Sequence, residues 1–319
     1  MSLTFCALSS GSKGNTTYIS DGNTSILLDA GLSGIEIERR MQSRGLRIEE
    51  IDAIVVSHEH TDHIHGVGVL SRRYRLPVHI TRPTLAAGQK QLGKIKETKH
   101  FECGRSFYVG TLQIHPFSVS HDAADPVGFT IKNKDKKIGI ATDLGIATGL
   151  VEEHLSLCSL LVLEANHDLQ MLEIGPYPWE VKQRVRSRLG HLSNEQSRDL
   201  LCNVLHESLQ HVVLAHISET NNDPKKAYDA VCAALSDASA DNLQLTVACQ
   251  ERAGEVIFLG SGFKVKLMQE RPYECGIHPV LAKRQAVLQR NLEETLCCRV
   301  NVKRARRATL SREPLNREP

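Results

Sequence analysis

Four side chains that bind divalent metals lie within six residues of one another: His58, His60, Asp62 and His63. Imidazole nitrogens and carboxylate oxygens together suit zinc, manganese or iron. His58 and His60 are two positions apart, so both can reach one ion from an extended or turning segment. Asp62 and His63 come after the turn and point toward a second ion. The alternative is a polar loop with incidental histidines, but four such residues in six exceed what 15 histidines in 319 residues provide.

This hexad, residues 58–63, follows an apolar run at 51–56 that is typical of a buried strand. Other residues that can bind a metal or transfer a proton also follow predicted strands. His121 comes after the strand predicted at 112–119, Asp143 after 136–141, and His216 after 211–215, while residues 164–168 follow the strand at 160–163. Because α/β folds build sites from loops at strand ends, we expect these side chains to meet at one edge of a sheet.

The alternation of predicted strands and helices occurs once in each half of residues 1–260 and predicts an α/β fold, a four-layer αββα sandwich. We expect one domain over residues 1–261. Residues 262–319 carry 13 Lys/Arg against 6 Asp/Glu, although the whole chain has a net charge of only +2. This basic extension is expected to be poorly ordered; the alternative is that it binds nucleic acid.

Several features bear on location. There is no apolar run near 18 residues and no basic segment typical of a signal peptide at the N-terminus, so we expect no membrane span and no secretion. The nine cysteines include no CxxC pair. We expect residues such as Cys158 and Cys202 to be buried thiols in a reducing, cytoplasmic protein.

The hexad resembles the HxHxDH signature of the metallo-β-lactamase superfamily. With residues 9–15, 57–63, 164–168, 190–194 and 214–218, the chain is similar to the YycJ/WalJ-type metal-dependent hydrolases, a bacterial group linked with 5′-to-3′ exonuclease activity on DNA. The resemblance covers about residues 3–260. It implies two divalent ions, zinc or manganese, with ligands divided as follows: His58, His60 and His121 for the first, Asp62, His63 and His216 for the second, and Asp143 bridging the two.

Two ions in such a site lower the pKa of a shared water and so produce a hydroxide nucleophile. Asp62 can also accept the proton of the nucleophile. His191, in the segment Gly190-His191-Leu192-Ser193, resembles the accessory histidine of the phosphodiesterase branch, which contacts the scissile phosphate and helps protonate the leaving oxygen. Alternatively, His191 is a structural residue just before the helix that Ser193 and Gln196 are expected to cap.

The resemblance also implies four residues near the substrate. Asn166 and His167 would lie beside the metals, and Ser10 and Asn15 near the phosphate. His167 could instead hydrogen-bond to a ligand residue. The loop at 9–15 offers hydroxyls, backbone N–H groups and Lys13 to an anion, but a plain turn between two strands is an equally open interpretation.

We therefore predict a metal-dependent phosphodiester hydrolase, most simply a 5′-to-3′ DNA exonuclease of the YycJ/WalJ type. One alternative is a small-molecule hydrolase acting on a cyclic phosphodiester, thioester or lactone. A ribonuclease Z-like RNA endonuclease is less favoured, because the sequence has no long glycine-rich arm of the kind that holds transfer RNA. A non-catalytic binding protein would be favoured by a missing ligand, and none is missing. Metal identity and oligomeric state stay open.

Overall fold

The computed structural model describes residues 2–235 and 243–260, and these form two seven-stranded sheets. The first sheet has the strand order β14-β1-β2-β3-β4-β5-β6 and the second has the order β13-β12-β11-β10-β9-β8-β7. The strands of the first are β1 (Leu3–Ser9), β2 (Thr16–Ser20), β3 (Ser25–Leu28), β4 (Ala53–Val55), β5 (Pro77–Ile80), β6 (Glu97–His100) and β14 (Ile257–Leu259). Those of the second are β7 (Phe107–Val109), β8 (Leu112–Ser118), β9 (Val127–Asn133), β10 (Lys136–Ala141), β11 (Leu160–Glu164), β12 (His211–Ala215) and β13 (Gln244–Val247).

Each sheet is half antiparallel and half parallel. In the first sheet β14, β1, β2 and β3 pair antiparallel, and β3, β4, β5 and β6 pair parallel. The second sheet repeats this plan, antiparallel from β7 to β10 and parallel from β10 to β13. Parallel strands end at the same edge of a sheet. The loops after β4, β10, β11 and β12 therefore begin at the edges where the parallel strands of the two sheets end.

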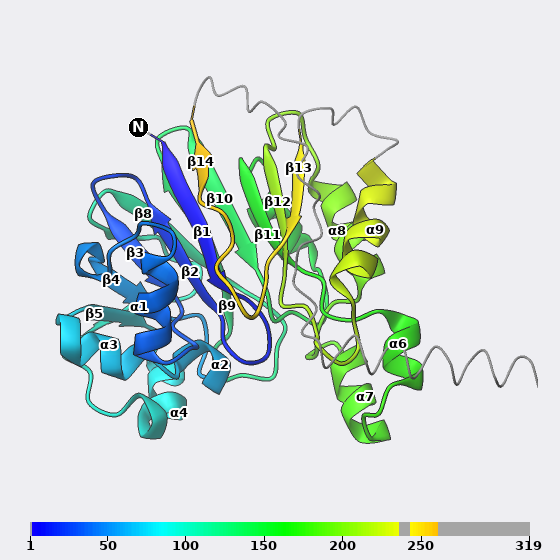
Figure 1. Ribbon diagram of the computed structural model, residues 1–319, viewed down its shortest axis with the longest axis horizontal. Helices are drawn as coiled ribbons and strands as arrows, with labels where there is room; N and C mark the ends of the chain where they lie inside the picture. Colours follow the sequence, from blue (N-terminus) through cyan, green and yellow to red (C-terminus); the bar gives the residue numbers. More distant parts are fainter. Residues whose placement is uncertain (1, 236–242, 261–319) are drawn as a thin grey trace, which may run out of the picture. The chain divides into compact units, whose positions relative to one another are not determined.

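Helices cover the outer face of each sheet, and the packing of apolar side chains follows from strand alternation. Along β1, Phe5 faces one cluster and Cys6 another, as successive side chains of a strand must. The helices α1 (Gly34–Gln42), α2 (Thr61–Ile64), α3 (Val67–Tyr74) and α4 (Arg82–Leu92) lie beside the first sheet (Figure 1). Their apolar residues complete the outer cluster of that sheet. Residues of α5 (Gly149–Leu155), α8 (Asn194–Val204) and α9 (Pro224–Leu235) do the same for the second. The remaining helices are η1 (Ile48–Glu50), α6 (Leu169–Ile174) and α7 (Trp179–Arg186).

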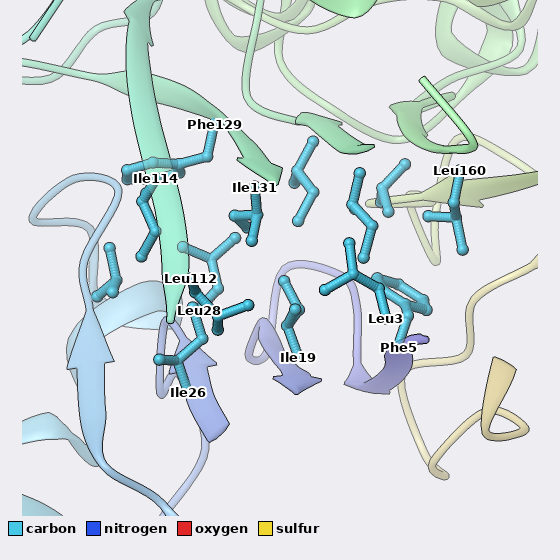
Figure 2. Close-up of a cluster of buried hydrophobic side chains, with 14 of the residues drawn as sticks. Leu3, Phe5, Ile19, Ile26, Leu28, Leu112, Ile114, Phe129, Ile131 and Leu160 are labelled. Atoms are coloured by element: carbon cyan, nitrogen blue, oxygen red, sulfur yellow. The ribbon is translucent and has the colours of Figure 1, made fainter. Parts of the chain in front are cut away.

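Between the two sheets lies a third apolar cluster. Figure 2 shows Phe5, Ile19 and Ile26 of the first sheet facing Ile114 and Phe129 of the second, all nearly inaccessible to solvent. Burying large aliphatic and aromatic side chains is the main favourable contribution to folding, about 1.5–3 kcal/mol for each. Three apolar layers between four layers of secondary structure confirm the predicted αββα sandwich.

Local signals placed most elements correctly. Ser193 and Gln196 form the predicted capping box at the start of α8. Residues 61–74 form two helices, α2 and α3, separated near Gly66. A Cβ on Gly66 would lie 2.3 Å from the Leu32 carbonyl oxygen, so the chain packs there too closely for any side chain. Helix α5 was not predicted, although the Thr148 hydroxyl caps it.

Of the two cysteines named as buried thiols in the sequence analysis, one is buried and the other is exposed. Cys158 is buried, as predicted, but Cys202 is exposed, because its position on α8 faces away from the apolar stripe that packs on the sheet. The basic extension at 262–319 lies outside the described residues, and so the proposed division at 261 stays a prediction. Within the described ranges, no helix combines the length and apolarity that crossing a membrane requires.

Candidate metal centre

The predicted ligands come from separate strand ends and meet in one cluster. The hexad follows β4 and includes α2, while His121 comes after β8, Asp143 after β10 and His216 after β12. Asp143 and His216 both have a φ of 56°, in the left-handed region that residues other than glycine rarely adopt. Such backbone conformations persist only where the surroundings hold them, and they gather at functional sites. Here both lie at the turns that bring a ligand-type side chain into the cluster.

Three histidines of the cluster form a compact triad. His60 Nδ1 lies 3.2 Å from His58 Nε2 and 3.3 Å from His121 Nε2. Nitrogens at the corners of a tetrahedron about 2.0–2.1 Å from a central zinc ion are about 3.3–3.4 Å apart. We call His58, His60 and His121 the first triad, and its spacing fits a single metal ion.

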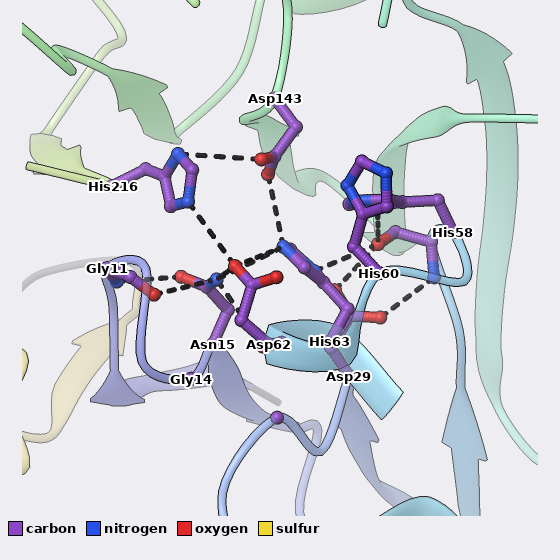
Figure 3. Close-up of polar contacts among 12 residues, drawn as sticks. Gly11, Gly14, Asn15, Asp29, His58, His60, Asp62, His63, Asp143 and His216 are labelled. Atoms are coloured by element: carbon purple, nitrogen blue, oxygen red, sulfur yellow. Dashed lines mark hydrogen bonds and ion pairs between the residues drawn. The ribbon is translucent and has the colours of Figure 1, made fainter. Parts of the chain in front are cut away.

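A second triad lies beside the first. The Asp62 Oδ2 atom is 3.5 Å from His63 Nε2 and 3.6 Å from His216 Nε2. Figure 3 shows Asp143 between His63 and His216, with Oδ2 3.3 Å from His63 Nε2. Its Oδ1 lies 3.9 Å from His121 Nε2, so Asp143 faces both triads. The structure therefore brings together all seven residues predicted as metal ligands, and Asp143 lies next to residues of both triads.

The cluster has the unmet contacts that a cation requires. Asp143 Oδ2 and His216 Nε2 are buried and have no hydrogen-bond partner among the described residues. A buried polar atom without a partner costs about 1–3 kcal/mol, and more when it is charged. Both atoms point at the other ligands, and the donor set is three residues around each of two points plus a shared carboxylate. These residues fit two divalent metal ions.

Two buried carboxylates orient the histidines, and neither was assigned a role from the sequence. Asp29 accepts from His63 Nδ1 at 2.7 Å and from the Ser57 backbone N–H and hydroxyl, both at 2.8 Å. Glu164, fully buried, accepts from His216 Nδ1 at 2.7 Å. A carboxylate on Nδ1 fixes the tautomer that leaves Nε2 free for a metal. Asp29 directly follows β3 and Glu164 is the last residue of β11, so an acidic residue at the end of a predicted strand was the sequence signal for both.

Glu164 also holds His191. The same Oε1 atom accepts from His191 Nδ1 at 2.8 Å, and Oε2 accepts from the backbone N–H groups of Leu144 and Leu192. Side-chain exposure of His191 is 21%, so its ring is reachable from solvent. Its ring centre lies 5.1 Å from those of His121 and His216. Within the cluster of Asp143, Glu164, His191 and His216, the Glu164 carboxylate thus accepts from the Nδ1–H groups of both histidines.

The two triads differ in electrostatics. Burial and the nearby His63 ring lower the pKa of His58 well below its usual value, and burial lowers the pKa of His121. Burial also opposes the charged forms of His63 and His216, but the surrounding carboxylates, Asp143 foremost, outweigh it and raise the pKa of both. Burial opposes the charged form of Glu164, but the hydrogen bonds and charge interactions with His191 and His216 outweigh it and lower the pKa of Glu164 to about 2.

Three of the four predicted substrate contacts touch residues of the second triad, and the fourth, His167, is buried. The Ser10 hydroxyl accepts from the His216 backbone N–H at 2.8 Å, and Asn15 Nδ2 donates to Asp62 Oδ2 at 3.0 Å. Asn166 Nδ2 donates to the His216 carbonyl at 2.9 Å. His167 is 1% exposed, and its Nδ1 has no partner in the described part of the chain. Burial also lowers the pKa of His167 to about 4.

Comparisons of the sequence and of the structure with known proteins point to the same family and fold. Residues 24–217 match the beta-lactamase superfamily domain. The chain is 36% identical over 239 residues to exodeoxyribonuclease YycJ of Bacillus anthracis, covering 74% of this chain and 90% of that protein. It is 37% identical over 238 residues to exodeoxyribonuclease WalJ of Streptococcus pneumoniae, covering 73% and 88%. In structure it is similar to the metallo-beta-lactamase fold protein YhfI of Bacillus subtilis, with a TM-score of 0.64, 15% identity, and coverage of 81% of this chain and all of that one.

Proposed function

The chain belongs to the metallo-β-lactamase superfamily, and from that premise we propose that it is a metal-dependent phosphodiester hydrolase, a 5′-to-3′ DNA exonuclease with a dinuclear centre. Two relatives at 36% and 37% identity, each aligned over most of its length, carry the name exodeoxyribonuclease. The observation that carries the proposal is the arrangement of His191. It lies against the paired triads, is fixed by the carboxylate that also fixes His216, and has a reachable ring.

Two divalent ions, zinc or manganese, fit the cluster. The first would be held by His58, His60 and His121, the second by Asp62, His63 and His216, with Asp143 shared. When bound, such a pair lowers the pKa of a water molecule and neutralises negative charge that develops on a phosphate during attack. Both imidazole-rich triads accept either metal, and the affinity order of metals does not decide occupancy.

The chain's own residues supply the proton transfers and the orientation. Asp62 is partly exposed, with 21% of its side chain accessible, so water can reach its carboxylate, and we assign to it the proton of the attacking water. Glu164 accepts from the His191 Nδ1–H; when the ring also carries a proton on Nε2, that proton can contact the phosphate and pass to the leaving oxygen, which leaves the neutral Nδ1–H ring. Ser193 caps α8 two residues further on, and the N-terminus of that helix favours an anion nearby.

The test is hydrolysis of a 5′-labelled DNA duplex and of bis-p-nitrophenyl phosphate with added zinc or manganese. We expect turnover of both by the wild type, and loss of both in Asp143→Ala. His191→Ala should retain both metals and lose about 10²- to 10⁴-fold in rate. His115→Ala is the matched control, because His115 lies on β8 with Ser106 as its side-chain partner and takes no part in the cluster.

Two outcomes would redirect the assignment. Binding of two metals without cleavage of either phosphodiester would overturn it in favour of a thioester or lactone hydrolase of the same fold. Cleavage of bis-p-nitrophenyl phosphate alone would indicate a small phosphodiester substrate. The length of labelled DNA products reports polarity, since removal of nucleotides from the 5′ end releases the label in the first cuts.

We also propose that DNA is the partner and that the protein works in the cytoplasm. Cys6 and Cys158 are buried free thiols, which supports a reducing compartment. Burial raises the pKa of Cys6 to about 12 and that of Cys158 to about 11, so both stay protonated and unreactive.

A further inference from the structure

The loop at residues 10–15, which we call the clamp loop, holds two of the three residues of the second triad. The Asn15 backbone N–H donates to the Asp62 carbonyl at 2.7 Å, and the His216 backbone N–H donates to the Ser10 hydroxyl at 2.8 Å. Asp62 follows a strand of the first sheet and His216 follows a strand of the second. The clamp loop therefore ties together ligands that the two sheets bring in separately.

Asn15 reaches the ligand atoms themselves, as Figure 3 shows. Its Nδ2 donates to Asp62 Oδ2 at 3.0 Å and to the Gly11 carbonyl at 3.1 Å, and it lies 3.1 Å from His63 Nε2. Its Oδ1 accepts from the Gly11 N–H at 2.9 Å. With both amide atoms engaged inside the protein and only 8% of the residue exposed, the side chain has no free group for a substrate phosphate.

Hydrogen bonds with the Gln250 side chain fix the clamp loop. Gln250 Nε2 donates to the Ser9 hydroxyl at 3.0 Å and to the Gly14 carbonyl at 3.2 Å, and its Oε1 accepts from the Lys13 N–H at 2.8 Å. Gly11 has a φ of 143°, and a Cβ there would lie 2.5 Å from Gln250 Oε1. The position of Asn15 is thus set by buried contacts and not by solvent.

We propose that Asn15 is a positioning residue for the second metal site. Its amide fixes the Asp62 carboxylate with Oδ2 toward His63 and His216, and in the described part of the chain it is the one side chain outside the seven predicted ligands that donates to that carboxylate. Among the contacts of the described residues, the Asn15 side-chain amide makes none with the first triad. The proposal rests on the proposed metal centre, but not on DNA as the substrate.

The direction of the effect follows from the lone pairs. A carboxylate oxygen accepts from the amide and still has capacity for a metal, so the bond to Asp62 survives metal binding. The single lone pair of His63 Nε2 can go to either the amide or an ion. Asp29 already orients His63 through Nδ1, whereas Asp62 depends on the Asn15 amide for its orientation, so we expect the restraint on Asp62 to outweigh the competition at His63 and loss of Asn15 to weaken the second ion.

The experiment is a titration of the metal-free full chain with zinc or manganese, followed by calorimetry and by elemental analysis after gel filtration. Wild type should bind two ions. Asn15→Ala should bind the first with unchanged affinity and the second about 10- to 100-fold more weakly, the usual effect of removing a group that orients a ligand. Its hydrolytic rate should recover as the metal concentration rises. Ser12→Ala, an exposed position in the same loop, is the matched control and should behave as wild type.

Each other outcome has a defined meaning. Two ions bound equally well by Asn15→Ala, with a raised KM for DNA, would overturn the proposal in favour of a phosphate contact. Tighter binding of the second ion would also overturn it and identify the amide as a competitor of the metal. Failure of the wild type to bind metal at all would instead remove the proposed function. If Asn15→Ala does not fold, Asn15→Ser, whose shorter side chain cannot span to Asp62, gives the same reading.

Discussion

The two triads have the same task but different supports. Behind the Nδ1 atoms of the first are neutral groups: Ser57 Oγ lies 3.0 Å from His58 Nδ1, and the Gly190 carbonyl lies 3.2 Å from His121 Nδ1, while the Asp122 carboxylate is 3.4 Å from the other ring nitrogen of His121. The second is backed by the carboxylates of Asp29 and Glu164 and by the amide of Asn15. A carboxylate makes the histidine it contacts a more basic ligand and holds it more firmly than a neutral acceptor does.

Because of these different supports, the two metal sites of one cluster should differ in how metal binding depends on pH. In the first triad the pKa values of His58 and His121 are lowered, so these rings are neutral and ready for a metal. In the second the pKa values of His63 and His216 are raised, so a metal competes there with protons. We therefore expect the first ion to bind over a wide pH range and the second to depend on pH and on its carboxylates.

Replacement of Asp143 should abolish the difference by damaging both triads. Asp143→Ala removes the one carboxylate that faces both, and we expect a rate loss of at least about 100-fold, since even partners that only orient ligands cost 10- to 100-fold. Hydrolysis of bis-p-nitrophenyl phosphate and metal content per chain measure it. A variant that kept two tightly bound ions would show that Asp143 does not bridge.

Replacement of Glu164 should affect only the second triad and His191. In Glu164→Gln only one acceptor oxygen remains, without charge, for the two Nδ1–H groups and the two backbone N–H groups that the carboxylate now serves, so both rings are held less firmly. We expect the second ion to weaken about 10- to 100-fold and the rate at saturating metal to fall by about 100-fold. His191→Ala separates the two effects, because it should lower the rate with both ions still bound. Equal metal loss in the two variants would contradict this division.

Asp29→Asn should produce a smaller effect on the same triad. The amide oxygen can still accept from His63 Nδ1, but without the charge, and so we expect the second ion to bind about tenfold more weakly with the first unchanged. Stepwise calorimetric titration measures both constants. The comparison between the triads fails if the first ion weakens as much as the second.

The pH dependence should separate the sites without mutation. A raised histidine pKa means that the metal-free second triad carries a proton that the ion must displace. The affinity of the second ion should therefore fall as pH falls from 8 to 6, by about tenfold per pH unit for each proton released. The first ion should change less, because His58 and His121 are already neutral. Calorimetry in buffers of different ionisation heat counts the protons, and equal release at both steps would refute the difference.

Much of the protein could be predicted from the sequence because the signals are local. The hexad at 58–63, the strand periodicities and the capping box at Ser193 depend on residues close in the chain, and they gave the αββα fold, the superfamily and the seven residues that meet in the cluster. Gly66 shows where local reading fails. The break between α2 and α3 depends on contact with the backbone of Leu32, which no pattern within residues 61–74 contains.

What the tertiary structure alone decided is the support of the site. The sequence placed Glu164 at a strand end and Asn15 in a polar loop, but hydrogen bonds to His191, His216 and Asp62 join residues 27 to 52 positions apart. Metal ligands are readable because their chemistry is in the side-chain type. The groups that orient them are ordinary polar residues, and only packing of the two sheets brings them within hydrogen-bond distance.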